Sequence, residues 1–304
     1  MAEKVTGNCP YCGKELEIPP DLPEFSCLYC GKRSHIDLLR SHGDYREEDL
    51  LELASQLPQT LQQHDTLYKH ISKKEYFPAF QAYEAEHSAL LKRIDALVLS
   101  APSRIEQIID TLCTTFLDTL EKNLREVRGY NTKIGRSNLL FEIKVVLALF
   151  LTPLIRKLEL AIAEPFCSTL HELWMKRYPR EYWVPGDYTK IAEGFRKKRM
   201  CFITTAVCAR EGKKDDCREL TQLRAFRDGW LRENGGNALI EEYYDIAPTL
   251  VTLIDHCGNP ETSYDEIRTR WLDPCLQALE QGQREECRDT YIHMVTTLRQ
   301  RYLQ

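Results

Sequence analysis

Four cysteines near the N-terminus constrain the fold of this chain more than any other feature. They form two CxxC motifs separated by 14 residues: Cys9, Cys12, Cys27 and Cys30. A glycine follows each motif, Gly13 after the first and Gly31 after the second. Glycine permits the positive φ angle that a tight turn needs when two thiolates face one ion. The spacing therefore predicts a closed, tetrahedral, structural zinc site made by these four thiolates.

The segment between the two motifs, ELEIPPDLPEFSC, predicts a short β-hairpin. We expect residues 1–40 to form a zinc ribbon that holds one structural Zn²⁺ per chain. Two alternatives compete with this interpretation: two unrelated CxxC pairs, or a redox pair of the thioredoxin type. The redox alternative is disfavoured because no βαβ pattern surrounds either motif.

The composition describes a chain that is large enough for buried cores. It has 304 residues, 43% of them hydrophobic, which allows two or three domains. The formal net charge of −5 disfavours nucleic acid and anionic membranes as partners, because both attract basic surfaces. The N-terminal sequence carries no apolar signal segment, so we expect a cytoplasmic protein. In that reducing compartment, clustered cysteines are typical of metal ligands or reactive thiols.

The periodicity is helical from residue 44 onward. An apolar stripe runs through residues 105–120, and residues 139–163 are apolar on nearly all sides. The longest apolar run, residues 145–155, is too short to cross a membrane, so we expect a core helix, kinked at Pro153, and no membrane span. The predicted fold class is mainly α, a multi-helix body with a small N-terminal β zinc ribbon. Three regions are expected: 1–40, 41–199 and 200–304.

Local signals also place helix boundaries. Three polar residues have the positions of helix N-caps: Asp44, Asp216 and Ser263. The glycine and asparagine content of residues 129–138 predicts a loop.

The most chemically dense stretch is residues 201–231. The sequence leaves three interpretations open for its cysteines: Cys201, Cys208 and Cys217. They are small buried residues of a helical core, or metal ligands together with His256 or Cys257, or Cys201 is a reactive thiol. The third interpretation rests on the basic residues 196–199 and an expected helix start, both of which favour a thiolate. The alternative for these four cations is that they end a helix, where its dipole favours positive charge. No motif links any of the eight histidines to Cys201.

Two arginines of this stretch lie on the helix expected after Asp216. Arg227 falls within its apolar face and Arg224 at the edge. A buried guanidinium needs an acceptor, so we expect an internal arginine–carboxylate network, a site for an anionic ligand, or two arginines that extend to the surface and pair there. The carboxylates considered are Asp216, Asp228, Glu241, Glu242 and Asp245. In the following helix, Pro248 frees the carbonyl of Tyr244, so the expected kink either shapes a pocket with Tyr244 as a candidate residue or bends the helix around the core.

Several motifs of this chain occur in the order found in a bacterial family. They resemble the CFI-box domain at the C-termini of many bacterial proteins: CFITTAVC (201–208), DDCRELTQLRAFRDGWL (215–231) and EEYYDIAP (241–248). Residues 145–166 and 188–198 resemble members that also carry an N-terminal zinc ribbon. The resemblance implies this domain order but no established activity. Some members have a motif similar to CFIATAAYG, without counterparts of Cys208 and Cys217, so a three-cysteine metal site is not implied.

Three functional hypotheses follow. Zinc ribbons of the type that residues 1–40 resemble bind DNA, RNA or protein, but this one carries five Lys or Arg against six acidic residues. The leading hypothesis is a non-enzymatic protein whose ribbon and helical domain serve protein interaction or assembly. The alternative is a thiol-dependent enzyme that uses Cys201, with these substrate contacts: Thr204, Thr205, Arg224, Arg227 and Tyr244. The third hypothesis is nucleic-acid binding through the ribbon.

Overall fold

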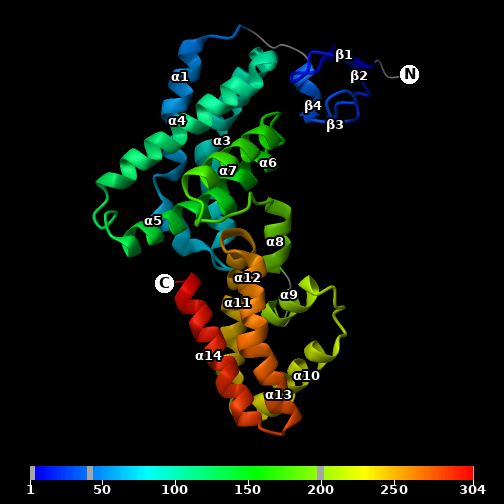
Figure 1. The fold of residues 1–304 in the computed structure, drawn as a ribbon, viewed down its shortest axis with the longest axis vertical. Helices are drawn as coiled ribbons and strands as arrows, with labels where there is room; N and C mark the ends of the chain where they lie inside the picture. The colour runs from blue at the N-terminus through cyan, green and yellow to red at the C-terminus, as the bar shows by residue number, and fades with distance from the viewer. Residues whose placement is uncertain (1–3, 40–43, 197–201, 304) are drawn as a thin grey trace. The chain divides into compact units, whose positions relative to one another are not determined.

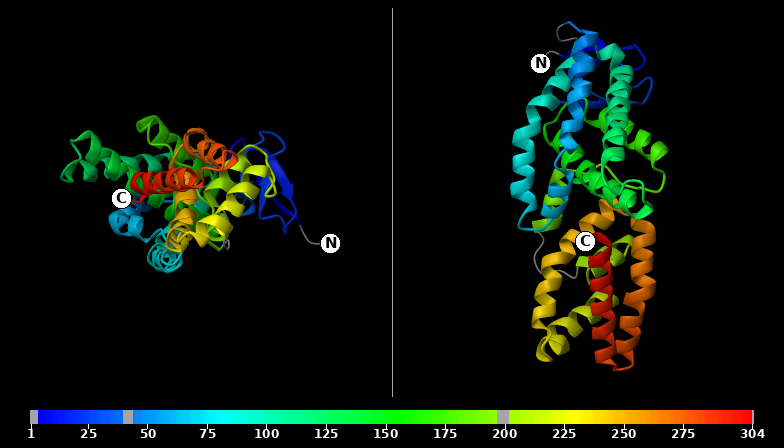
Figure 2. Two further views of the ribbon diagram at one scale, coloured as in Figure 1. Left: turned by 90° about the horizontal axis from the view of Figure 1, so that it is seen from below. Right: turned by 90° about the vertical axis from the view of Figure 1, so that its left-hand side faces the viewer.

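The computed structural model describes residues 4–39, 44–196 and 202–303. Helices make up most of this part of the chain, and strands occur only at its N-terminal end (Figure 1, Figure 2). The predicted fold class, mainly α with a small β region, is confirmed. The chain divides into two compact units. The first runs to Asp65 and includes Phe80–Tyr188, and the second combines Thr66–Ala79 with the chain from Thr189.

The ribbon consists of two separate antiparallel sheets of two strands each. Strand β1 (Val5–Asn8) pairs with β2 (Glu15–Ile18), and β3 (Glu24–Ser26) pairs with β4 (Arg33–His35). The segment between the CxxC motifs therefore supplies β2 and β3, which pair outward rather than with each other. The predicted single hairpin there is wrong, because each strand pairs across its own cysteine turn. A small apolar cluster supports the sheets: Val5, Leu16, Phe25, Ile36 and Leu39.

Helices before residue 188 vary greatly in length. They are α1 (Glu47–Gln56), α2 (His64–Leu67), α3 (Tyr76–Ser100), α4 (Ile105–Glu126), α5 (Lys133–Val146), α6 (Thr152–Lys157) and α7 (Ala163–Arg177). The apolar stripe of α4 is buried along its length, as its periodicity predicts. The expected loop at 129–138 is wrong from Lys133 onward, because the Thr132 side chain caps α5 by accepting from the Gly135 N–H. The N-cap of α1 is Arg46, not Asp44, and no side chain caps that helix end.

The predicted core helix is a run of three segments. Helix α5 continues through a π-helical turn (Leu147–Leu151) into α6, and the residues of that turn are fully buried. The carbonyl of Leu147 accepts from the Thr152 hydroxyl at 2.8 Å, one residue before Pro153. Where a kink is expected at Pro153, the helix has a wider, π-helical turn. This turn gives other partners to the backbone carbonyls that would lack one, because proline has no N–H to donate. This stretch, Lys133–Lys157, is long and apolar enough to cross a membrane, but 78% of its most apolar window is buried, as in a core helix.

From Tyr188 onward the described residues form helices and the turns that join them. These are α8 (Tyr188–Arg196), α9 (Phe202–Arg210), α10 (Arg218–Phe226), α11 (Asn237–Cys257), α12 (Pro260–Ile267), α13 (Asp273–Glu280) and α14 (Arg284–Tyr302). Two predicted caps are wrong by a few residues. The N-cap of α10 is Cys217 rather than Asp216, and α12 starts at Pro260, where Asn259 rather than Ser263 accepts the capping hydrogen bond. Helix α11 continues through Pro248, as expected.

Candidate metal centre

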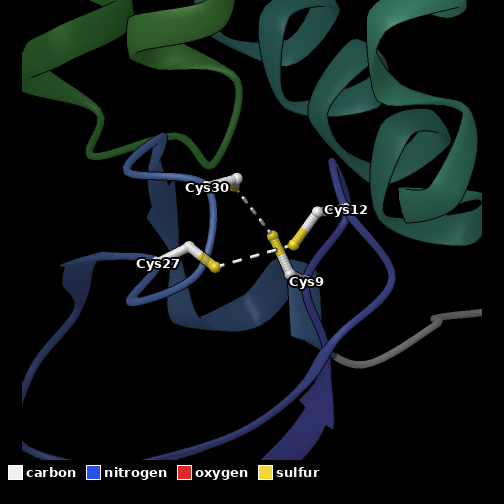
Figure 3. Close-up of side chains that lie close together, drawn as sticks. All are labelled: Cys9, Cys12, Cys27 and Cys30. Atoms are coloured by element: carbon white, nitrogen blue, oxygen red, sulfur yellow. Dashed lines mark hydrogen bonds between the residues drawn. The ribbon is translucent and has the colours of Figure 1, made fainter.

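The four ribbon cysteines converge on one point. Their sulfur atoms all lie within 4.8 Å of one another (Figure 3). Two of the Sγ–Sγ distances, Cys9 to Cys30 and Cys12 to Cys27, are 3.8 Å. A tetrahedral zinc ion with Zn–S bonds of about 2.3 Å requires S–S edges of about 3.8 Å. The sulfurs therefore have the spacing that a tetrahedral metal site needs.

Two turns of the same design place these sulfurs. In the first, the Gly13 N–H donates to the Cys9 carbonyl at 2.9 Å, and in the second the Gly31 N–H donates to the Cys27 carbonyl at 2.8 Å. Both glycines have positive φ, +71° and +72°, a conformation that other residues rarely adopt. The glycine that follows each CxxC motif thus closes its turn. This is the role that the sequence predicts for Gly13 and Gly31.

The four thiols differ in burial, and the two buried ones differ in pKa. Cys9 and Cys27 are buried, whereas Cys12 and Cys30 are exposed. Burial raises the pKa of Cys9 to about 12. Burial also acts to raise the pKa of Cys27, but backbone N–H groups of Cys30 and Tyr29 outweigh it and lower that pKa to about 7. The Tyr29 N–H lies 3.4 Å from the Cys27 sulfur, so the turn stabilises negative charge there.

The donor set fits a metal ion of borderline softness. Four thiolates complete a tetrahedral shell and leave no position for water or substrate, which is the arrangement of structural sites. Within the described residues, this is the only group of three or more histidine, cysteine or acidic side chains close enough to share an ion. The arrangement is therefore able to stabilise the ribbon, and it offers no open coordination position for catalysis.

The cysteines of the 201–231 stretch are placed differently. Cys201 lies outside the described residues. Cys208 is buried at 1% exposure and packs against Leu220, with the half-buried Cys217 beside them. Burial raises the pKa of Cys208 to about 12. These two thiols therefore sit in a small apolar cluster rather than among further metal ligands.

Both arginines singled out in the sequence meet carboxylates. Arg224 donates to the Asp215 carboxylate at 2.6 Å and to its carbonyl at 2.9 Å. Arg227 donates to both oxygens of Asp228, at 2.9 and 2.7 Å, and its guanidinium lies over the Tyr244 ring. Hydrogen bonds from the arginines lower the pKa of each carboxyl group. Asp228 is one of the predicted partners, whereas Asp215, which lies in the turn that folds back over the first turns of α10, is not.

A cavity of the second unit lies among α8, α9, α11 and α12. It has a volume of about 550 Å³, and its lining includes Phe202, Thr205, Arg210, His256 and Tyr264. The Tyr264 hydroxyl donates to the Asp255 carboxylate at 2.8 Å, and the Arg210 guanidinium lies over the Tyr264 ring. Sequence reasoning missed this group because it comes from three separate helices and forms no motif.

Thr204 and Thr205 are neighbours in sequence but line different cavities. Thr205 lines the larger one, whereas Thr204 lines a small apolar cavity with Arg227, Tyr243 and Tyr291. Of the substrate contacts proposed from sequence, Thr204 and Arg227 therefore share a cavity, whereas Thr205 lies apart because successive helical positions point about 100° apart.

No protein-family model, curated protein or solved structure matches this chain.

Proposed function

We propose that this chain is a zinc-stabilised adaptor whose ribbon presents an apolar contact to a protein partner. Exposed side chains at the second cysteine turn carry the proposal. Leu28 is 91% exposed and Tyr29 is 66% exposed, although both lie between Cys27 and Cys30. Because those two sulfurs turn inward to the metal centre, the residues between them are held outward. A leucine and a tyrosine in that position add nothing to the ribbon core and are suited to bury area against a protein.

The charges of the ribbon favour a protein over a nucleic acid. Several of its cations are paired within the chain: Lys4 with Glu17 at 3.2 Å, Lys32 with Glu106, and Arg33 with Glu24. A nucleic-acid surface needs clustered cations that are available to phosphates. We therefore rank nucleic-acid binding behind protein contact. A reducing cytoplasmic location belongs to the same proposal, because thiolate ligands must stay reduced.

The metal is the first point to test. Elemental analysis of the purified full chain should find about one zinc per chain, since one set of four thiolates forms a complete site. The variants Cys9→Ser and Cys27→Ser should each lose it. Iron in place of zinc, or no metal at all, would overturn the zinc assignment.

Photo-cross-linking tests the contact itself. A photoreactive amino acid at position 28 should form one discrete adduct in cell extract, whereas the same group at Ile134, an exposed position on α5, should not. Unlabelled wild-type chain should compete for the adduct, and a chain carrying Leu28→Asp and Tyr29→Asp should not. Equal competition by the two chains would show that these side chains do not form the contact.

The thiol-dependent enzyme is a second candidate, favoured by one observation. His256 lines the same 550 Å³ cavity as Phe202, the residue that follows Cys201 in the sequence. A histidine is the usual base that activates a catalytic thiol, so His256 is the residue to test together with Cys201. Alkylation of Cys201 should then be fast below about pH 8 and slower in His256→Asn. A rate that matches an unfolded cysteine peptide would count against this candidate.

A further inference from the structure

Two cysteines meet at the ends of the turn between α9 and α10. Cys208 lies near the C-terminal end of α9, and Cys217 is the N-cap of α10. The two side chains pack together with Leu220 in an apolar cluster of their own. Cys208 is buried and Cys217 is half-buried, so a small molecule in solvent reaches Cys217 first.

The backbone of this turn holds its two ends together. The Lys213 N–H donates to the Cys208 carbonyl at 3.0 Å, and the Cys217 N–H donates to the Lys214 carbonyl at 3.1 Å. The Lys213 side chain also pairs with Glu211 at 2.7 Å and with Glu219 at 2.6 Å. Backbone hydrogen bonds and ion pairs therefore hold this turn, and the two cysteine side chains at its ends pack together without any covalent link.

We infer that Cys217 and Cys208 form a thiol–disulfide exchange site that accepts a low-molecular-weight disulfide such as oxidised glutathione. The Cys217 thiolate attacks one sulfur of that disulfide, whose S–S bond breaks and releases one glutathione thiolate. Cys208 then loses its proton to solvent and attacks the Cys217 sulfur of the mixed disulfide, which releases the second glutathione thiolate. The two protein thiols lose two electrons, oxidised glutathione gains them, and the two protons end on the two glutathione molecules.

Other cysteine pairs in the helical units provide internal controls. Cys275 and Cys287 lie close together, with the Cys275 thiol donating to the Cys287 carbonyl at 3.6 Å, but both are fully buried. Cys113 and Cys167 are also fully buried. An oxidant that acts from solvent has no access to these four sulfurs in the folded chain. Access at Cys217, rather than proximity alone, thus distinguishes the proposed site.

The test treats the folded full chain with oxidised glutathione, blocks free thiols at intervals, and identifies linked peptides by mass spectrometry. A Cys208–Cys217 peptide should appear at least about tenfold faster than any link between Cys275 and Cys287, because only Cys217 is accessible. Excess dithiothreitol should reverse it. In Cys208→Ser, the Cys217 mixed disulfide with glutathione should accumulate, because its resolving thiol is gone.

Three results would overturn the proposal. Cys217 staying as a mixed disulfide in the wild-type chain would show that Cys208 does not resolve it. A link from Cys217 to Cys201 would assign a different partner. Linkage that appears only in denaturant, or equally fast at Cys275 and Cys287, would show that the folded turn confers no selectivity. Far-ultraviolet circular dichroism of the Cys208→Ser chain, matched to wild type, verifies that the variant is folded.

Discussion

The ribbon and the α9–α10 turn are two cysteine-bearing regions that the same chain stabilises in different ways. Each has a glycine near φ +70°, Gly13 and Gly31 in the ribbon and Gly212 in the turn. In the ribbon, four sulfurs face a single point above a very small apolar core. In the α9–α10 turn, the two cysteines pack against Leu220, and the ion pair of Lys213 with Glu219 stabilises the loop that joins the two helices. The comparison shows that four cysteines in two CxxC turns converge on one point, whereas two cysteines nine residues apart pack against a leucine.

The largest expected effect is loss of the ribbon when its metal is removed. The ribbon has two two-stranded sheets and a small core, so the proposed zinc ion would supply most of its folding free energy, about 10–16 kcal/mol in comparable zinc peptides. A strong chelator, or Cys9→Ser, should abolish amide protection in residues 5–35 while the helical circular dichroism signal changes little. Hydrogen exchange followed by mass spectrometry measures both regions at once.

A matched substitution distinguishes the loss of a metal ligand from the loss of a thiol elsewhere in the chain. Cys217→Ser should leave the zinc content and the ribbon protection unchanged, since Cys217 lies in the other cysteine region. If that variant lost zinc, or if Cys9→Ser kept it, the division between the two regions would be wrong.

The next effect in size concerns the apolar partner of the thiol pair. Leu220 is buried beside Cys208, and Leu220→Ala should cost about 2–5 kcal/mol through lost burial and a residual cavity. Denaturant unfolding monitored in the second unit measures the loss, and metal content should stay at the wild-type value. Leu51→Ala is the control, because Leu51 is exposed on α1 and its truncation should change stability by less than about 0.5 kcal/mol. Loss of metal in Leu220→Ala would link the two regions.

Sequence reasoning succeeded where the signal is local. The CxxC spacing predicts both the sulfur cluster and the role of Gly13 and Gly31, because a four-residue turn determines its own geometry. The apolar stripe of α4 and the burial of residues 145–155 follow from periodicity in the same way. The helix caps were less predictable, since Asp44 and Asp216 compete with neighbouring residues for the same position.

The features that the sequence did not reveal depend on how segments pair and pack, which no short motif encodes. The β2 and β3 strands pair outward because each cysteine turn brings its own two strands together, which composition does not indicate. The group of Arg210, Asp255 and Tyr264 comes from three helices whose packing no short motif encodes. Asp215 reaches Arg224 only because the turn folds back over α10. The candidate metal centre was thus readable from sequence, whereas the cavity was not.

A smaller effect is expected from alanine at the glycines of the two cysteine-bearing regions. A Cβ atom at Gly13, Gly31 or Gly212 meets nothing within 4 Å, so alanine there adds backbone strain alone, about 1–2 kcal/mol at positive φ. In Gly13→Ala the strain should appear as zinc affinity reduced by about 5- to 30-fold. In Gly212→Ala it should appear as lower stability of the second unit, with zinc affinity unchanged. Gly229→Ala, which has open space and no positive φ, should be neutral or slightly stabilising. Equal zinc loss in Gly13→Ala and Gly212→Ala would contradict the comparison.

The smallest effect is expected from acid, and it should reach the two regions at different pH. Ribbon thiolates take up protons as the pH falls, so the metal should leave first. The hydrogen bond from Lys213 is the main cause that lowers the pKa of Glu219 from 4.5 to about 2. The contribution of this ion pair to stability is therefore complete above about pH 4.5 and is lost as the pH falls toward 2. Partial exposure limits it to under about 1 kcal/mol.

Amide protection of residues 211–217 should weaken across that interval in the wild-type chain and be low throughout in Glu219→Gln. Glu280→Gln, which removes an exposed partner of Arg218, should leave the profile unchanged. If the turn lost protection together with the metal, at higher pH, then the ribbon ion rather than the ion pair of Lys213 would be what holds it.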